Sequence, residues 1–194
     1  GPVTVRGVRI GVPICEDIWL EESEDYENVV ECLAETGAEI LVVPNGSPYA
    51  RDKADLRLSI VVARVTESGL PLIYLNEVGG QDELIFDGAS FALNADLSVA
   101  AQLPAFEENI TTLTWRKTAD GWRCSGPSTA QLEGDKADYA ACVLGLRDYV
   151  RKNGFPGVLL GVSGGIDSAL CAAIAVDALG ADKVRGTAPY AYEH

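Results

Sequence analysis

The sequence contains no methionine, not even at position 1, and only one histidine among its 194 residues. We therefore expect this chain to be a segment of a longer protein. Basic residues are also few: 15 Lys and Arg stand against 29 Asp and Glu, which gives a formal net charge of −14. Nucleic acids are held mainly by clusters of Lys and Arg. Because the basic residues here are scattered, we expect no nucleic-acid partner.

Long hydrophobic runs are absent as well. No apolar stretch reaches the roughly 20 residues that a membrane helix needs, and the N-terminus lacks the charged-then-apolar order of a signal peptide. We therefore expect a cytoplasmic protein with no membrane partner. With 47% hydrophobic residues and 20 glycines, the composition is typical of a globular protein that buries a core.

The five cysteines are odd in number, widely spaced and contain no CxxC pair. This spacing argues against a disulfide framework and against a zinc site. One thiol can still be chemically active, and Cys15 is the candidate because the predicted strand of residues 3–14 leads directly into it. The alternative is that Cys15 is a small buried hydrophobe, as most lone cysteines are. Since Glu16 and Asp17 follow at once, a reactive Cys15 thiolate would need a cationic partner.

Hydrophobic periodicity predicts alternating strands and helices in the first part of the chain, which is an α/β pattern. The expected helices cover residues 25–36 and 53–68, each ending at a glycine, and the expected strands cover residues 3–14, 39–44 and 72–75. Asp87-Gly88 between two apolar runs is the signature of a two-residue hairpin. Weak periodicity from about residue 107 to residue 133 predicts a linker.

A second α/β pattern follows the predicted linker. A helix is expected from Asp135 to a cap at Gly154, then a buried strand over residues 157–162, an alanine-rich helix over residues 169–179, and a last strand near Val184. Between the strand and the alanine-rich helix stands the hexapeptide Ser163 to Ser168, read Ser-Gly-Gly-Ile-Asp-Ser.

A tight glycine turn that joins a strand to a helix forms an anion site, because unpaired N–H groups and the positive helix end meet there. The turn is not a Walker A loop, which requires a lysine, and it is not a GxGxxG fingerprint. Asp167 would repel a bare phosphate, so its presence favours a divalent metal that bridges the two. The alternative is that Gly164 and Gly165 only allow the strand and helix to pack closely.

The order Ser-Gly-Gly-x-Asp-Ser resembles the pyrophosphate loop of the N-type ATP pyrophosphatases. The segment Gly11 to Trp19 resembles the nucleophile segment of the nitrilase-like amidases, and residues 44–49 and 76–83 resemble the loops that follow it in that family. Taken in chain order, these motifs resemble the glutamine-dependent NAD+ synthetases over nearly the whole chain.

The resemblance implies a fold and a domain organisation. The fold class is α/β: the C-terminal part of a nitrilase-like α-β-β-α sandwich, followed by the start of a Rossmann-like doubly wound parallel sheet of the adenine nucleotide alpha hydrolase type. The implied domains are a glutaminase part over residues 1–126, a linker over 127–134, and the start of the ATP-binding synthetase domain over 135–194.

The resemblance also implies an activity: hydrolysis of glutamine to ammonia, and ATP-driven adenylylation of deamido-NAD+ to give NAD+, AMP and pyrophosphate. Cys15 is the implied nucleophile, and Ser47 and Lys53 the implied glutamine contacts. The implied ATP contacts are Gly161, Val162, Ser163, Gly164, Gly165, Ile166, Asp167 and Ser168, with Mg²⁺ at Asp167. The implied partners are glutamine and deamido-NAD+, and a homo-oligomer is expected.

The family's glutamate base and lysine lie upstream of the cysteine, whereas here the first glutamate is Glu16 and the first lysine is Lys53. Two alternatives to the ligase therefore stay open: a stand-alone carbon–nitrogen hydrolase, and a non-catalytic fragment that binds nucleotide.

Overall fold

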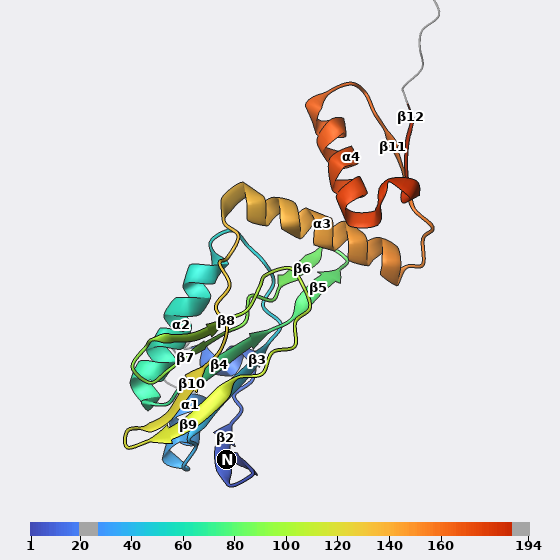
Figure 1. Ribbon diagram of the computed structural model, residues 1–194. Helices are drawn as coiled ribbons and strands as arrows, with labels where there is room; N and C mark the ends of the chain where they lie inside the picture. The colour runs from blue at the N-terminus through green and yellow to red at the C-terminus, as the bar shows by residue number, and fades with distance from the viewer. Residues whose placement is uncertain (20–26, 188–194) are drawn as a thin grey trace, which may run out of the picture. The chain divides into compact units, whose positions relative to one another are not determined.

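The computed structural model describes residues 1–19 and 27–187, and within them the chain forms two compact units (Figure 1). The first unit comprises residues 1–78 and 86–132, and the second comprises residues 79–85 and 133–187. The structure is mixed α/β, as the sequence predicts. Among the described residues, no helix is both long and apolar enough to cross a membrane.

The first unit is built on a six-stranded sheet. Its strands, in spatial order, are β1 (Val3–Val5), β2 (Val8–Gly11), β3 (Ile40–Asn45), β4 (Leu72–Asn76), β7 (Phe91–Leu93) and β8 (Val99–Gln102). β2, β3 and β4 run parallel, and the remaining neighbours pair antiparallel. Two helices accompany the sheet, α1 (Val29–Glu35) and α2 (Lys53–Ser68).

The two faces of this sheet are covered by different elements, because side chains alternate along a strand. Leu72 and Tyr74 of β4 point into the main core, which α1 and α2 supply with Val30, Leu33, Val61 and Val65. Ile73, between them, belongs to a smaller cluster on the other face. That cluster is completed from the hairpin β9 (Thr114–Thr118) and β10 (Gly121–Ser125) by Trp115 and Cys124.

The second unit contains a β-α-β element. A long helix, α3 (Gly134–Lys152), precedes β11 (Val158–Gly161), α4 (Ile166–Leu179), a short 3-10 helix η2 (Ala181–Lys183) and β12 (Val184–Thr187). β11 and β12 pair in parallel, with Val158 opposite Val184. The hairpin of β5 (Val78–Gln81) and β6 (Leu84–Asp87) reaches α3 through Gly80, whose N–H donates to Asp148 Oδ2 at 2.8 Å.

Several predicted elements are confirmed. α2 covers residues 53–68 as expected and ends at Gly69, whose φ of +68° places it in the left-handed region that glycine favours. β3, β4, α3, β11 and β12 lie within one or two residues of their predicted bounds, whereas α4 begins three residues earlier than expected. The prediction that the helix around α1 begins at residue 25 falls partly outside the described residues.

The single strand expected over residues 3–14 is wrong. The chain reverses at Arg6 and Gly7, whose φ values are +49° and +84°, and β1 and β2 form an antiparallel pair. β2 ends at Gly11, and Cys15 begins a 3-10 helix, η1 (Cys15–Ile18), instead of ending a strand. Two consecutive residues with positive φ are typical of a tight hairpin turn, which strand periodicity alone does not reveal.

Two further predictions are corrected. Asp87-Gly88 is not a hairpin turn: β6 pairs with β5, whereas β7 pairs with β4 and β8. Asp87 is buried, and its carboxylate forms an ion pair with Arg57, which lies far away in the sequence. The weak periodicity after residue 107 also hides the β9–β10 hairpin, which packs on the sheet of the first unit and is not part of a linker.

The carboxylate of Glu39 anchors the β9–β10 hairpin. Its Oε1 accepts hydrogen bonds from Lys117 Nζ (2.8 Å) and Trp122 Nε1 (3.2 Å), and its Oε2 accepts from the Arg9 N–H (3.1 Å). The bond from Lys117, followed by those from Arg9 and Trp122, lowers the pKa of Glu39 to about 2. The contacts therefore favour the ionised carboxylate.

We expect this anchor to be lost only in strong acid. A carboxylate with a depressed pKa stabilises the folded state fully above its unfolded pKa, and loses that contribution as the pH falls through its folded pKa. The Trp122 indole N–H resonance should therefore shift between pH 4.5 and about 2. In Glu39→Gln this titration should be absent. A midpoint at the ordinary glutamate value in the unchanged chain would contradict the anchor.

Candidate functional site

Cys15 occupies a strained backbone position. It is the first residue of η1 and has a φ of +50°, which is rare for a residue other than glycine. The short helix is fixed locally, because the Ile14 N–H donates to Asp17 Oδ2 at 2.7 Å and Ile18 is buried in the core. Such strain persists only where the surroundings enforce it, and it gathers at active sites. The thiol of Cys15 is partly exposed.

Ser47 follows the carboxyl end of β3 and is held by the neighbouring strand. β3 and β4 are parallel and in register, so Asn45 lies opposite Asn76. Asn76 Oδ1 accepts the Ser47 N–H at 2.9 Å, and Asn76 Nδ2 donates to the Ser47 carbonyl oxygen at 3.2 Å. The loop that carries Ser47 is therefore held at the carboxyl ends of the parallel strands, where ligands of such sheets usually bind.

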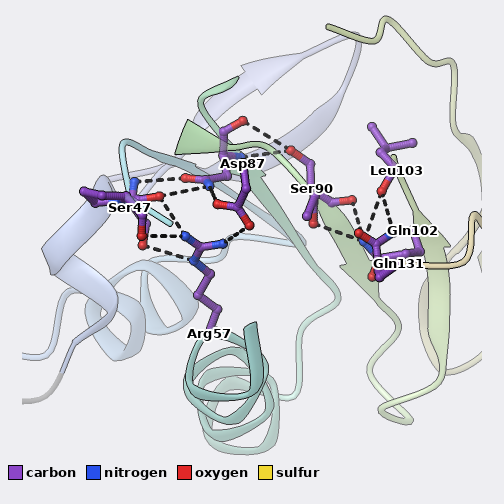
Figure 2. Close-up of polar contacts among 10 residues, drawn as sticks. Ser47, Arg57, Asp87, Ser90, Gln102, Leu103 and Gln131 are labelled. Carbon is purple, nitrogen blue, oxygen red and sulfur yellow. Dashed lines mark hydrogen bonds and ion pairs between the residues drawn. The ribbon is translucent and has the colours of Figure 1, made fainter. Parts of the chain in front are cut away.

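An ion pair between Arg57 and Asp87 lies beside Ser47, as Figure 2 shows. Arg57 NH1 and Asp87 Oδ2 are 2.8 Å apart, and their side chains are only 3% and 7% exposed. The sequence patterns predicted neither residue as part of the site. A signal was present: Arg57 precedes the buried Val61 and Val65 by four and eight residues, so a charged residue occupies the core-facing side of α2.

The hydroxyl of Tyr74 lies in the same region. Tyr74 is 2% exposed and stacks on Phe91 with 5.2 Å between ring centroids. Burial raises the pKa of Tyr74; the nearby Ser47 hydroxyl and Arg57 oppose this rise, and Cys15 and Asp87 add to it. Tyr74 packs in the same core cluster as Ile18 of η1, the short helix that begins at Cys15. The Tyr74 hydroxyl forms no hydrogen bond of good geometry within residues 1–19 and 27–187.

Lys53 is placed differently from the sequence expectation. It is the first residue of α2, and no hydrogen bond joins its Nζ to Ser47 in the described part of the chain. The cation that contacts Ser47 is Arg57, one helical turn further along. η1, which begins at Cys15, packs against β3, the strand that leads to Ser47, whereas no hydrogen bond joins Lys53 to either residue in the described part of the chain.

The glycine turn of the second unit connects β11 to α4. Gly164 has a φ of +88°, so the turn requires glycine there. Ser163 Oγ and Ser168 Oγ lie 3.2 Å apart, and Ser168 Oγ donates to the Gly165 carbonyl at 2.9 Å. The turn is exposed, and the first N–H groups of α4 at its end lack helical partners. This geometry suits an anion.

Asp167 stands in the first turn of α4. The described residues contain no group of three or more His, Cys, Asp or Glu that could hold a metal ion by themselves. A lone carboxylate nevertheless fits Mg²⁺, which usually keeps several waters and is shared between one or two carboxylates and substrate phosphates. Asp167 with the hydroxyls of Ser163 and Ser168 would provide the protein's part of such a site.

Comparison with known proteins assigns a family to each part of the chain. Residues 1–123 match the carbon-nitrogen hydrolase family and residues 138–189 match the NAD synthase family. The chain belongs to the carbon-nitrogen hydrolase family and continues into an NAD synthase-like part. This is the nitrilase-like part, followed by the start of an NAD synthase-like α/β part, that the sequence predicts.

Similar proteins carry both parts. The chain is 55% identical over 184 residues to a glutamine-dependent NAD(+) synthetase of Rhodobacter capsulatus and 43% identical over 187 residues to one of Acinetobacter baylyi. These matches cover 94% and 96% of this chain but only 32% and 33% of the relatives. The chain therefore spans about a third of the length of the curated relatives that it matches.

A solved structure resembles the whole chain. It is a glutamine-dependent NAD+ synthetase from Acinetobacter baumannii in complex with ADP, with a TM-score of 0.86 and 39% identity over 100% of this chain and 36% of that protein. A second synthetase, from Cytophaga hutchinsonii, has a TM-score of 0.58 at 23% identity, over 94% of this chain and 28% of that protein, and shows similarity of fold alone.

Proposed function

We propose that this chain is part of a glutamine-dependent NAD+ synthetase. The observation that carries the proposal is the joint presence, in one chain, of a strained cysteine in the hydrolase part and a glycine anion turn in the NAD synthase part. The 55% identity to a synthetase that is about three times as long supports it. The proposed domains are residues 1–126, a linker over 127–134, and residues 135–194.

In the proposed glutaminase reaction Cys15 is the nucleophile. Its sulfur attacks the side-chain amide carbon of glutamine, so that a C–S bond forms and the C–N bond breaks. The leaving nitrogen takes up a proton and departs as ammonia, and water then hydrolyses the glutamyl thioester to glutamate. We propose that the Ser47 hydroxyl contacts the bound glutamine and that Lys53 forms an ion pair with the α-carboxylate of that glutamine.

In the proposed synthetase reaction, residues 161–168 hold the phosphates of ATP. The carboxylate of deamido-NAD+ displaces pyrophosphate from the α-phosphorus, and ammonia then displaces AMP to form NAD+. The chain's own contribution is the donor array at the start of α4, which is positioned before the charge develops on the leaving pyrophosphate. When bound, Mg²⁺ would neutralise phosphate charge, and Asp167 is the side chain proposed to hold it.

We further propose that the protein is a cytoplasmic homo-oligomer with glutamine and deamido-NAD+ as its substrates and with no nucleic-acid or membrane partner. The acidic composition supports only the nucleic-acid part of this proposal.

The proposal is tested with the full-length protein that carries this segment. With glutamine, ATP, Mg²⁺ and deamido-NAD+, we expect NAD+, glutamate, AMP and pyrophosphate in equal amounts, measured by liquid chromatography. Amide hydrolysis without any need for ATP, and with no nucleotide affinity, would show a stand-alone hydrolase. Nucleotide binding without turnover would show a non-catalytic nucleotide-binding protein. Either result contradicts the ligase.

A further inference from the structure

The guanidinium of Arg57 contacts both Asp87 and the loop that carries Ser47. NH1 forms the ion pair with Asp87, whereas Nε and NH2 face the Ser47 loop. Nε donates to Ser47 Oγ at 3.1 Å, and NH2 donates to the carbonyl oxygens of Ser47 (2.7 Å) and Pro48 (3.0 Å). Figure 2 shows this fork, with Arg57 rising from α2 between Ser47 and Asp87. Asp87 thus fixes the plane in which the guanidinium meets the loop.

The contact from Nε determines the direction of the Ser47 hydroxyl. A serine hydroxyl offers one proton and two lone pairs. Because Arg57 has no acceptor, Ser47 Oγ can only accept in this contact, and its own proton points away from the guanidinium. Since Ser47 is 6% exposed, Oγ has little water to satisfy that donor. A ligand acceptor atom is the natural partner.

The hydroxyl of Tyr74 is a second donor, and it has no hydrogen-bond partner in the part of the chain that the structure describes. This hydroxyl is buried, and Tyr74 packs in the same core cluster as Ile18 of η1. Buried hydroxyls without a partner are costly and rare. The Ser47 and Tyr74 hydroxyls can therefore each donate to an oxygen acceptor of a bound ligand.

We propose that Arg57, held by Asp87, is a positioning residue that sets the Ser47 hydroxyl as a hydrogen-bond donor toward an acceptor oxygen of the amide substrate bound at Cys15. This inference rests on the proposed function, because it takes glutamine as that substrate. Neither Arg57 nor Asp87 contacts the substrate in this role. Lysine cannot replace Arg57, since a single ammonium cannot meet Asp87, Ser47 Oγ and two carbonyl oxygens with fixed geometry.

The test uses Arg57→Lys in the full-length protein, because this variant keeps the positive charge beside Asp87. Steady-state rates are measured with glutamine and, separately, with ammonium as nitrogen donor. We expect the KM for glutamine to rise about tenfold to a hundredfold, the range for one lost hydrogen bond to a charged group. The ammonium-driven kcat should stay within about twofold, since that reaction bypasses the amide site.

Arg64→Lys is the matched control. Arg64 is the second buried arginine of α2, lies on the same face two turns further along, and pairs with Glu67 and not with Ser47. Its replacement should lower the thermal stability as Arg57→Lys does but leave the KM for glutamine unchanged. If the two variants raise this KM equally, Arg57 has only a structural role and the inference is overturned.

A double-mutant cycle asks whether Arg57 acts through Ser47. Residues that act as a unit have non-additive effects. The KM for glutamine of Ser47→Ala/Arg57→Lys should therefore equal that of Ser47→Ala alone. Full additivity would overturn the inference while the unchanged enzyme still uses glutamine. If the unchanged enzyme makes NAD+ from ammonium but never from glutamine, the proposed glutaminase function fails first, and the inference fails with it.

If Arg57→Lys does not fold, Arg57→Gln with Asp87→Asn replaces it. This pair leaves no uncompensated buried charge, which is the main cost of breaking a buried ion pair. The expected result is the same rise in the KM for glutamine. An unchanged KM in this folded double variant overturns the inference.

Discussion

Replacing Cys15 with alanine is expected to abolish NAD+ synthesis from glutamine and to leave synthesis from ammonium largely intact. The thiol is the proposed nucleophile, and loss of a covalent nucleophile typically lowers kcat by about 10⁴-fold or more. Ammonium supplies the nitrogen without passing through the thioester. The measurement compares the two nitrogen donors under the same conditions in the full-length protein. Equal loss with both donors would contradict the role of Cys15.

Cys32→Ala is the matched control for this experiment. Cys32 is also a free, partly exposed cysteine of the first unit. Its thiol donates to Glu27 at 3.3 Å, and this bond, together with burial and nearby carboxylates, raises the pKa of Cys32. A raised pKa leaves less thiolate, and the thiolate is the nucleophile. Both nitrogen donors should therefore support full activity in Cys32→Ala, and glutamine should protect only Cys15 from iodoacetamide.

The second large effect is expected at the glycine turn. Gly165→Val should reduce ATP-dependent synthesis with either nitrogen donor by about 10²- to 10³-fold, the loss typical of removing preorganised stabilisation of a leaving anion. The fold itself should tolerate this change. Gly165 has a φ of −83°, and a Cβ there would meet only Ser163 Oγ at 3.6 Å. The added side chain would instead occupy the place of the phosphate.

The same experiment includes Asp167→Asn and a control. Asp167→Asn should lower the Mg²⁺-dependent rate of ATP turnover, because an amide is a poorer ligand for a hard cation than a carboxylate. Ala169→Val adds bulk to an exposed residue of the same helix outside the turn, so it should leave ATP turnover unchanged. Glutamine hydrolysis should persist at some level in all three variants. Unchanged ATP affinity in Gly165→Val, measured by calorimetry, would contradict the nucleotide site.

The elements that the sequence predicted well are those governed by local physics. The apolar residues of α2 recur at helical spacing and are followed by a glycine, so its bounds could be predicted to the residue. β3 and β4 are short apolar runs between turn residues, and they too were predicted closely. The glycine turn was also identifiable, because its residues are consecutive and their chemistry does not depend on distant partners.

The failed predictions depend on partners far along the chain. Asp87-Gly88 has the local signature of a hairpin, yet Asp87 is bound by Arg57, 30 residues earlier. The β9–β10 hairpin shows weak periodicity of its own, and its place is decided by Trp115 and Cys124 packing on the sheet and by Glu39. Local propensity is a weak prior that such contacts override.

The sequence by itself determined the α/β class, the family resemblance, and the candidacy of Cys15 and of the Ser163 to Ser168 turn. Only the tertiary structure decided that the Cys15 backbone is strained and that Arg57, paired with Asp87, donates a hydrogen bond to Ser47. The physical reason is that periodicity reports which side of an element faces the core, whereas the partner of a buried charge depends on how strands and helices assemble. A buried arginine must be paired, but its sequence position does not name its partner.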